Sequence, residues 1–140
     1  ATEIGVAKII PIISERTEVK DLNIERAKKI VVEATEQSNQ LNVPDIEEPQ
    51  KLKDFINSLD GNTNLFFADI NTEKKIDNKI IGKSKKISLL VGPEGDFSPN
   101  EREMILAKDN VISFSISKNI LRTETATISA LSLINYSLNL

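Results

Sequence analysis

The segment Val91–Pro99 has the residue types of a ligand-binding loop. It reads Val-Gly-Pro-Glu-Gly-Asp-Phe-Ser-Pro and continues from an apolar run, Ile87–Val91, that predicts a buried strand. Gly92 and Gly95 would allow backbone angles closed to other residues and let a ligand approach the main chain. Pro93 stiffens the segment between them. A tight strand-to-helix turn that binds nothing is the alternative interpretation.

The same loop lacks the features of a phosphate site. It has neither a Gly-Lys-Ser/Thr ending nor a Gly-x-Gly-x-x-Gly array. Glu94 would also repel a phosphate, because like charges in close contact destabilise each other. A ligand with a cationic or a neutral polar group therefore suits this loop better.

A second segment, Ser117–Ala126, lies between a predicted strand and the last predicted helix. It reads Ser-Lys-Asn-Ile-Leu-Arg-Thr-Glu-Thr-Ala. Thr123 is expected to be the N-cap, and Glu124 favours the positive helix end, so helix capping alone explains these two residues. Arg122 is not explained in this way, because a cation gains nothing beside a positive helix end. We therefore expect Arg122 to meet a negative group or a polar edge, such as that of a nucleotide.

The chain contains no histidine and no cysteine. A Ser-His-Asp triad, a Cys-His pair, a His-ligated zinc, a thiolate metal site and a disulfide are therefore excluded. Proton transfer would have to use Asp, Glu, Lys, Tyr, water or the substrate itself. We expect no bound metal.

Size and charge restrict the possible partners. A chain of 140 residues suits one domain with one core. The net charge of −3 counts against RNA as a partner, because phosphate neutralisation favours basic domains. A local basic patch or another domain must then supply the attraction. The sequence shows neither a signal peptide nor an apolar run near the roughly 20 residues that span a bilayer, so we expect no membrane contact and a cytoplasmic location.

Strands and helices are expected to alternate along the chain. The expected strands are Ala7–Ile13, bent or at an edge because of Pro11, and Leu65–Ala68, Ile87–Val91 and Val111–Phe114. The expected helices are Ile24–Gln37, Leu52–Leu59, Pro99–Lys108 after a Ser98 N-cap, and Thr123–Leu138. Gly5 is expected to end a short helix at the N-terminus. This alternation predicts an α/β fold with a mainly parallel sheet, with both loops at the carboxyl edge of its strands.

The segment Asn71–Lys86 carries six lysines and few apolar residues. We expect it to be a solvated surface segment, as charge runs usually are. Contact with RNA phosphates is the alternative interpretation.

The two loops together resemble the RsmE family, whose members methylate a uridine of small-subunit ribosomal RNA at ring nitrogen N3. The similarity continues in Ala1–Val6, Pro11, Ser14–Arg16 and Glu33–Ser38, and so covers nearly the whole chain. It implies the SPOUT fold, α/β with a C-terminal deep trefoil knot. It also implies that residues 1–140 are a catalytic domain, without the N-terminal PUA-like RNA-binding barrel of the family.

The resemblance implies S-adenosylmethionine as the cofactor and a homodimer that holds it near the partner subunit. The residues expected to bind the cofactor are Val91, Gly92, Pro93, Glu94, Gly95, Ser117, Ile120, Leu121, Thr123 and Ala126. The substrate implied is small-subunit ribosomal RNA, in an assembled or assembling subunit. No metal is implied.

The implied reaction is an in-line displacement at a sulfonium, which depends on near-attack geometry. The proton on uracil N3 must leave or be shared, and Glu36, Glu94 or water would accept it. Arg122 or Arg16 would stabilise the negative charge that develops on the base. Alternatively, Glu36 is an ordinary residue on a helix surface and Arg16 a solvated loop cation.

Two residues depart from the family pattern. Asp96 stands where glycine is usual, and Gln40 stands where arginine is usual. Two other functions therefore stay open. One is another SPOUT methyltransferase acting on transfer RNA or on a ribose oxygen, which the segment Ile120–Ala126 argues against. The other is a catalytically silent module for RNA binding or dimerisation.

Overall fold

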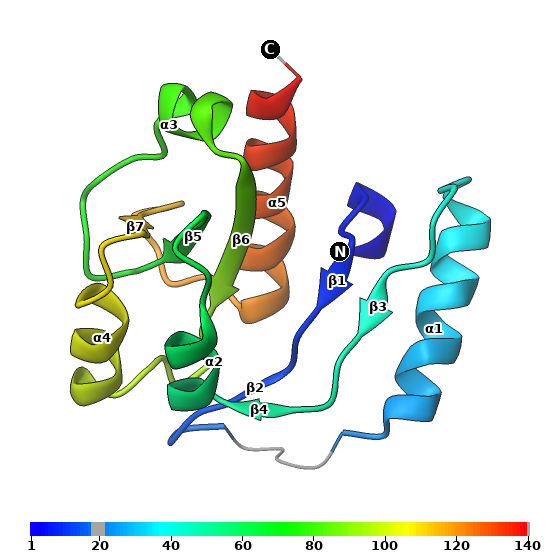
Figure 1. The fold of residues 1–140 in the computed structure, drawn as a ribbon, viewed down its shortest axis with the longest axis horizontal. Coiled ribbons are helices and arrows are strands. Elements are labelled where there is room, and N and C mark those ends of the chain that lie inside the picture. The colour runs from blue at the N-terminus through cyan, green and yellow to red at the C-terminus, as the bar shows by residue number, and fades with distance from the viewer. Residues whose placement is uncertain (18–21, 140) are drawn as a thin grey trace.

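The computed structural model describes residues 1–17 and 22–139. Strands and helices alternate along the chain, as expected (Figure 1). The helices are η1 (Thr2–Ile4, a 3-10 helix), α1 (Ile24–Gln37), α2 (Leu52–Ser58), α3 (Asn78–Lys83), α4 (Pro99–Leu106) and α5 (Thr123–Leu138). The strands are β1 (Lys8–Ile9), β2 (Ile12–Ile13), β3 (Asp45–Ile46), β4 (Gln50–Lys51), β5 (Thr63–Ala68), β6 (Lys86–Val91) and β7 (Val111–Phe114).

The central sheet has three parallel strands in the order β6-β5-β7. Ala68 at the end of β5 lies opposite both Val91 of β6 and Phe114 of β7. All three strands therefore end at the same edge. The α/β fold with parallel strands is confirmed.

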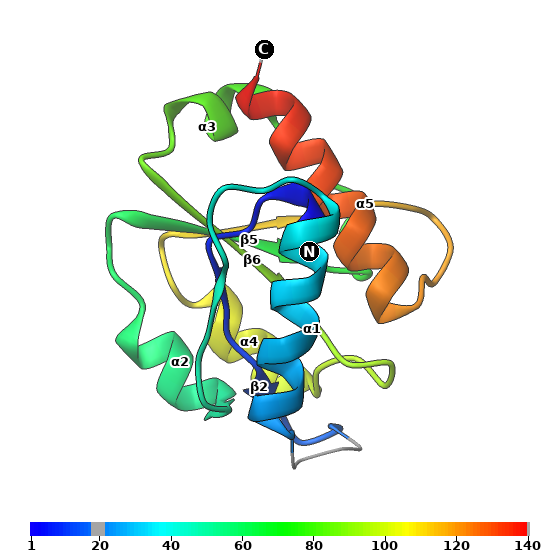
Figure 2. The ribbon, with the colours of Figure 1, turned by 90° about the vertical axis from the view of Figure 1, so that its right-hand side faces the viewer.

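The side chains of β5 alternate between two hydrophobic cores, as a strand period of two requires. Leu65 and Phe67 pack with α2, α4 and the loop residue Phe97 on one face. Phe66 packs on the other face against Phe114, with ring centroids 6.3 Å apart, and against buried residues of α3 and α5. Helices thus cover both faces of the sheet (Figures 1 and 2).

The first expected strand is divided at Pro11. Its two short parts, β1 and β2, pair in parallel with β3 and β4. Pro11 lacks an N–H group, and its carbonyl accepts a hydrogen bond from Gln50 N at 3.0 Å. Gly5 ends η1 with a φ of 91°, which confirms the expected helix end.

The structure adds elements that the sequence patterns did not indicate. The residues between α1 and α2, where no helix or strand was expected, contain β3 and β4. The lysine-rich segment is mostly exposed, as expected, and it also contains α3, because Asp77 caps its start and Ile81 is buried against α5. α4 ends at Leu106, two residues before the expected end near Lys108.

The described residues contain no helix long and apolar enough to cross a membrane. The trefoil knot stays a prediction, because strand order and register do not define the threading of a chain.

Candidate functional site

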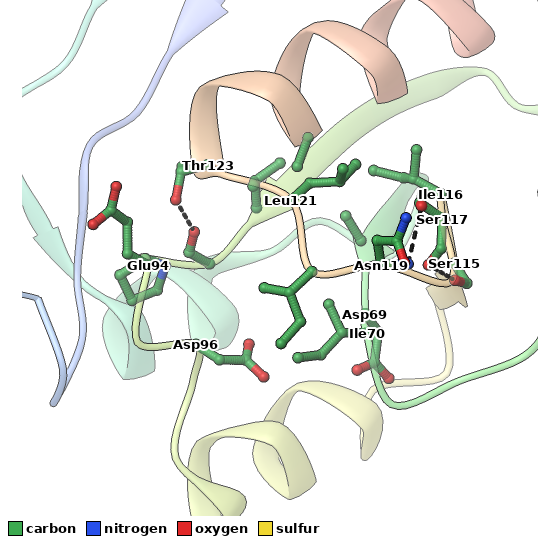
Figure 3. Close-up of a pocket in the computed structure, with 16 residues that line it drawn as sticks. Asp69, Ile70, Glu94, Asp96, Ser115, Ile116, Ser117, Asn119, Leu121 and Thr123 are labelled. Carbon is green, nitrogen blue, oxygen red and sulfur yellow. Dashed lines mark hydrogen bonds between the residues drawn. The ribbon is translucent and has the colours of Figure 1, made fainter.

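A pocket lies at the edge where β5, β6 and β7 end (Figure 3). Its lining comes from the three segments that follow these strands and from the first turn of α5. The lining residues are Ala68, Asp69 and Ile70; Val91–Glu94 and Asp96; Ser115–Ser117 and Asn119–Leu121; and Thr123 and Ala126. Because the strand ends are in register, the two loops singled out in the sequence meet here.

The pocket contains all but one of the residues expected to bind a cofactor. Gly95 is the exception. The expectation missed the segment after β5, where Asp69 and Ile70 complete one side of the pocket. The strand-end rule would have found Asp69, because this carboxylate directly follows the predicted strand Leu65–Ala68.

The loop between β6 and α4 is fixed at its carboxyl end. Phe97 is 5% exposed, and its ring centroid lies 5.8 Å from that of Phe67 in the core. Ser98 Oγ accepts a hydrogen bond from Glu101 N, and Glu101 Oε1 accepts one from Ser98 N. With Pro99 in the first helical position, this is the predicted helix start, and it is confirmed.

The two glycines of this loop do not have the backbone angles expected of them, whereas the expected approach of a ligand to their main chain stays a prediction. Neither Gly92 nor Gly95 has a positive φ, whereas Asp96 has a φ of 61°. A Cβ on Gly92 would lie 3.2 Å from Cε2 of Phe97 and 3.3 Å from Oδ1 of Asp96. A side chain at position 92 would therefore crowd Phe97 and Asp96, because the loop folds back over this position.

Arg16 contacts the outer side of this loop. Its Nη1 donates a hydrogen bond to Gly95 O at 2.9 Å, and a Cβ on Gly95 would lie 3.4 Å from Cβ of Arg16. Glu15 N donates to Glu101 Oε2 at 3.3 Å. Arg16 is exposed and does not line the pocket. Its observed contact is with the outer side of the loop at Gly95.

Thr123 is not the N-cap of α5. Arg122 holds that position, and its side chain makes no capping hydrogen bond. Thr123 Oγ1 instead donates to Gly92 O at 3.0 Å (Figure 3). The N-cap therefore lies one residue earlier than expected. The Thr123 hydroxyl links the two loops.

Arg122 and Glu36, two of the expected catalytic residues, do not line the pocket. Both are exposed. Glu36 lies in the last turn of α1, toward the carboxyl end of α5, whereas the pocket lies at the amino end of α5 (Figures 1 and 2). The catalytic roles of these residues and of Arg16 stay predictions.

The loop between β7 and α5 is held mainly by local contacts. Ser115 Oγ donates to Ser117 O at 3.1 Å, and Asn119 N donates to Ser117 Oγ at 3.1 Å. Its longer connection is from Ser115 N to Lys74 O at 2.7 Å. Ile120, which lines the pocket, is 81% exposed.

The buried carboxylate of the lining residue Asp69 forms an ion pair with the half-buried Arg102. The Asp69 side chain is 1% exposed, and Arg102 Nη2 donates to its Oδ2 at 2.8 Å while Nε contacts both oxygens. This hydrogen bonding raises the pKa of Arg102, partial burial opposes it, and the charges of Asp69 and Asp96 add to the increase. No pattern in the sequence indicates this pair, because its residues are 33 positions apart.

The lining suits an amphipathic ligand with positive charge. Ile70, Ile116 and Leu121 supply apolar surface, and Asp69, Glu94 and Asp96 supply carboxylates. The lining contains no lysine or arginine. Within residues 1–17 and 22–139, no three carboxylates are grouped so as to hold a metal ion.

A second groove lies between β2, the start of α2 and the start of α4. It is lined by Ile13, Ser14, Glu15, Lys51, Leu52, Lys53, Asn100, Glu101 and Met104. None of the residues expected to bind a cofactor or to act in catalysis lines it.

Comparison with known protein families identifies the domain. Residues 1–135 match the family described as RNA methyltransferase domain. The chain belongs to this family. The RNA methyltransferase domain is 39% identical over 136 residues to ribosomal RNA small subunit methyltransferase E of Rickettsia conorii, covering 94% of this chain and 54% of that protein. It is 37% identical over 145 residues to the Aquifex aeolicus protein of the same name, covering 96% of this chain and 58% of that protein.

Solved structures resemble the RNA methyltransferase domain as well. The Neisseria gonorrhoeae ribosomal RNA small subunit methyltransferase E bound to S-adenosyl methionine gives a TM-score of 0.87 at 29% identity, covering 96% of this chain and 56% of that one. A putative methyltransferase of Legionella pneumophila with bound cofactor SAM gives 0.84 at 30% identity, covering 97% and 57%. The RsmE resemblance is confirmed, and the chain spans a little over half the length of these relatives.

Proposed function

We propose that residues 1–140 form a catalytic domain that uses S-adenosylmethionine to methylate a uridine at N3 in small-subunit ribosomal RNA. The observation that carries this proposal is the pocket formed by both predicted loops at the carboxyl edge of the sheet. The names of the relatives support the small ribosomal subunit as the site of action.

The chemistry of the pocket fits the proposed cofactor. The apolar side chains of Ile70, Ile116 and Leu121 suit an adenine ring, and the carboxylates of Glu94 and Asp96 suit an amino group or a sulfonium. Two similar solved structures contain this cofactor. We assign its binding to the lining residues of the two loops. Gly95 would act indirectly, because its carbonyl accepts a hydrogen bond from Arg16 on the outer side of the loop.

S-adenosylmethionine supplies an electrophilic methyl group, whose transfer to N3 leaves the electron pair of the broken C–S bond on sulfur. The protein has to orient the base and accept the N3 proton. Glu94 is favoured as the acceptor, directly or through water, because it lines the pocket. Glu36 is less favoured, because it does not line the pocket of its own chain. Arg122, next to the pocket residues Leu121 and Thr123, would donate to the uracil oxygens.

The lysine-rich segment is divided between the two edges of the sheet. α3 and the start of β6 lie at the edge opposite the pocket, since β6 ends at the pocket, and this placement favours solvated lysines there. Lys74 lies at the pocket edge, where its carbonyl accepts a hydrogen bond from Ser115 N, so contact of this part of the segment with RNA phosphates stays open. We propose that efficient methylation needs an additional basic RNA-binding domain, and that the reaction is then sensitive to salt.

We also propose that the active form is a homodimer in the cytoplasm. Ile128 and Tyr136 on α5 are 54% and 67% exposed, and they lie on the opposite side of this helix from Ala130 and Ile134 in the core. A second copy would cover them. Sedimentation at several protein concentrations tests this: a monomer at every concentration would contradict it.

Methylation of small ribosomal subunits that lack the modification tests the main proposal. The domain, fused to a basic RNA-binding domain, should produce N3-methyluridine, detected by mass spectrometry of digested RNA. The domain alone should be much slower. Methyl transfer to transfer RNA or to a ribose oxygen would favour the other SPOUT activities. Cofactor binding without transfer to any RNA would favour a silent module.

A further inference from the structure

Asp96 is placed to act on a ligand in the pocket. It lines the pocket, and its carboxylate points from the loop after β6 toward the side where Asp69 lies (Figure 3). Asp96 N donates to Pro93 O at 2.8 Å, which closes a turn and fixes the backbone. The backbone position of Asp96 is thus set by the loop that Phe97 anchors in the core.

The charges around Asp96 leave the pocket negative. Asp69 is neutralised by its ion pair with Arg102, whose Nε donates to Oδ1 and whose Nη2 donates to Oδ2. In the described part of the chain, neither Asp96 nor Glu94 forms an ion pair. The charge of Asp96 also acts on Arg102, but the hydrogen bonds of Arg102 go to Asp69. Asp96 and Glu94 therefore supply negative charge without a dedicated partner.

We propose that Asp96 makes the pocket discriminate between the charged methyl donor and its neutral product. This inference rests on the proposed function. S-adenosylmethionine carries a positive sulfonium, whereas S-adenosylhomocysteine carries a neutral thioether and is otherwise alike. A carboxylate in a partly enclosed pocket attracts the positive sulfonium of the donor. The neutral thioether of the product offers it no charge to attract. Asp96 would thus favour exchange of product for a new donor after each turnover.

The backbone at Asp96 permits a conservative test. Its φ of 61° lies in the left-handed region, which asparagine tolerates as well as aspartate does. Asp96→Asn therefore removes the charge while keeping the shape and the turn. Asp96→Gly removes the side chain at a position where glycine is unstrained.

The experiment measures dissociation constants of both ligands by titration calorimetry. The proteins are the wild-type chain, Asp96→Asn, Asp96→Gly and the control Asp109→Asn. Asp109 is exposed and lies two residues before β7, at the sheet edge opposite the pocket. The control thus makes the same change in net charge at a distance. Sinefungin, which carries an amine in place of the methylated sulfonium, serves as a second cationic ligand.

We expect both Asp96 variants to raise the dissociation constants of S-adenosylmethionine and sinefungin by about fivefold to tenfold. The dissociation constant of S-adenosylhomocysteine should change little. Added salt should reduce the difference. Asp109→Asn should behave like the wild type. Equal affinity ratios in the wild type and in both folded Asp96 variants would overturn the inference while leaving the proposed function intact. A folded wild type that binds none of the three ligands would overturn the proposed function and this inference together.

Discussion

The two loops of the pocket are built in different ways. The loop after β6 ends in a residue of the core, Phe97, and in a complete capping box. The loop after β7 is held mainly by its own serine and asparagine side chains, and Ile120 at its centre is 81% exposed. It also leads into a helix whose N-cap, Arg122, makes no capping hydrogen bond. One wall of the pocket is therefore anchored in the core at its carboxyl end, whereas the other is anchored at Ile116, near its start, and is exposed at its centre.

This difference suggests how the pocket divides its tasks. A wall fixed by folding presents carboxylates and backbone groups without an ordering cost when a ligand binds. A wall with few contacts to the core can close over the ligand afterwards, as binding segments of low local stability do. The hydrogen bond from Thr123 to Gly92 O connects the two walls.

The largest expected effect is on the anchor of the fixed wall. Phe97→Ala should lower the free energy of unfolding by about 3–5 kcal/mol, because it removes a buried ring from the core. Ile120→Ala is the matched change in the other loop and should alter it by less than about 0.5 kcal/mol. Urea unfolding measures both. Similar losses in the two variants would show that the loops are anchored alike.

The second effect concerns Arg122 and separates activity from stability. Arg122→Ala should slow single-turnover methylation at least about 100-fold, the scale of losing one oriented charge-stabilising donor. Its unfolding free energy should change by less than about 1 kcal/mol, because the side chain makes no capping bond. Arg122→Lys keeps the charge and loses the planar fork. An Arg122→Ala protein that melts much earlier but turns over normally would make this residue structural.

The smallest effect tests why Gly92 is a glycine. Gly92→Ala should cost about 1–3 kcal/mol of stability, because the new Cβ would press on Phe97. Gly82→Ala in α3 is the control, since its Cβ would meet nothing within 4 Å. That change should stabilise the protein by up to about 1 kcal/mol through helix propensity. Thermal melts compare the stabilities of the two variants. An unchanged stability of Gly92→Ala would show that the loop accommodates a Cβ at this position.

Much of the framework was predictable because its signals are local. The bounds of α1, β7 and α5 agree with the expected ones, since long helical periodicity and a short apolar run are properties of adjacent residues. The capping box at Ser98 was predictable for the same reason.

The missed features depend on contacts between residues distant in sequence. Arg102 pairs with Asp69 across 33 residues, and Arg16 contacts Gly95 across 79. Neither contact has a sequence pattern. β3 and β4 contain two residues each, too few to show a period. Thr123 was expected to be a cap because local rules take no account of a nearby carbonyl, here that of Gly92.

The most direct test of the central claim is the nuclear magnetic resonance spectrum of the backbone amides during titration with S-adenosylmethionine. Saturable shifts should concentrate in Val91–Asp96 and Ser117–Leu121, with α3 nearly unchanged. If the second loop is the adaptable wall, its signals should also sharpen or change most. A folded protein whose spectrum does not respond would contradict the account. So would saturable shifts confined to the second groove, around Ile13–Glu15 and Lys51–Lys53.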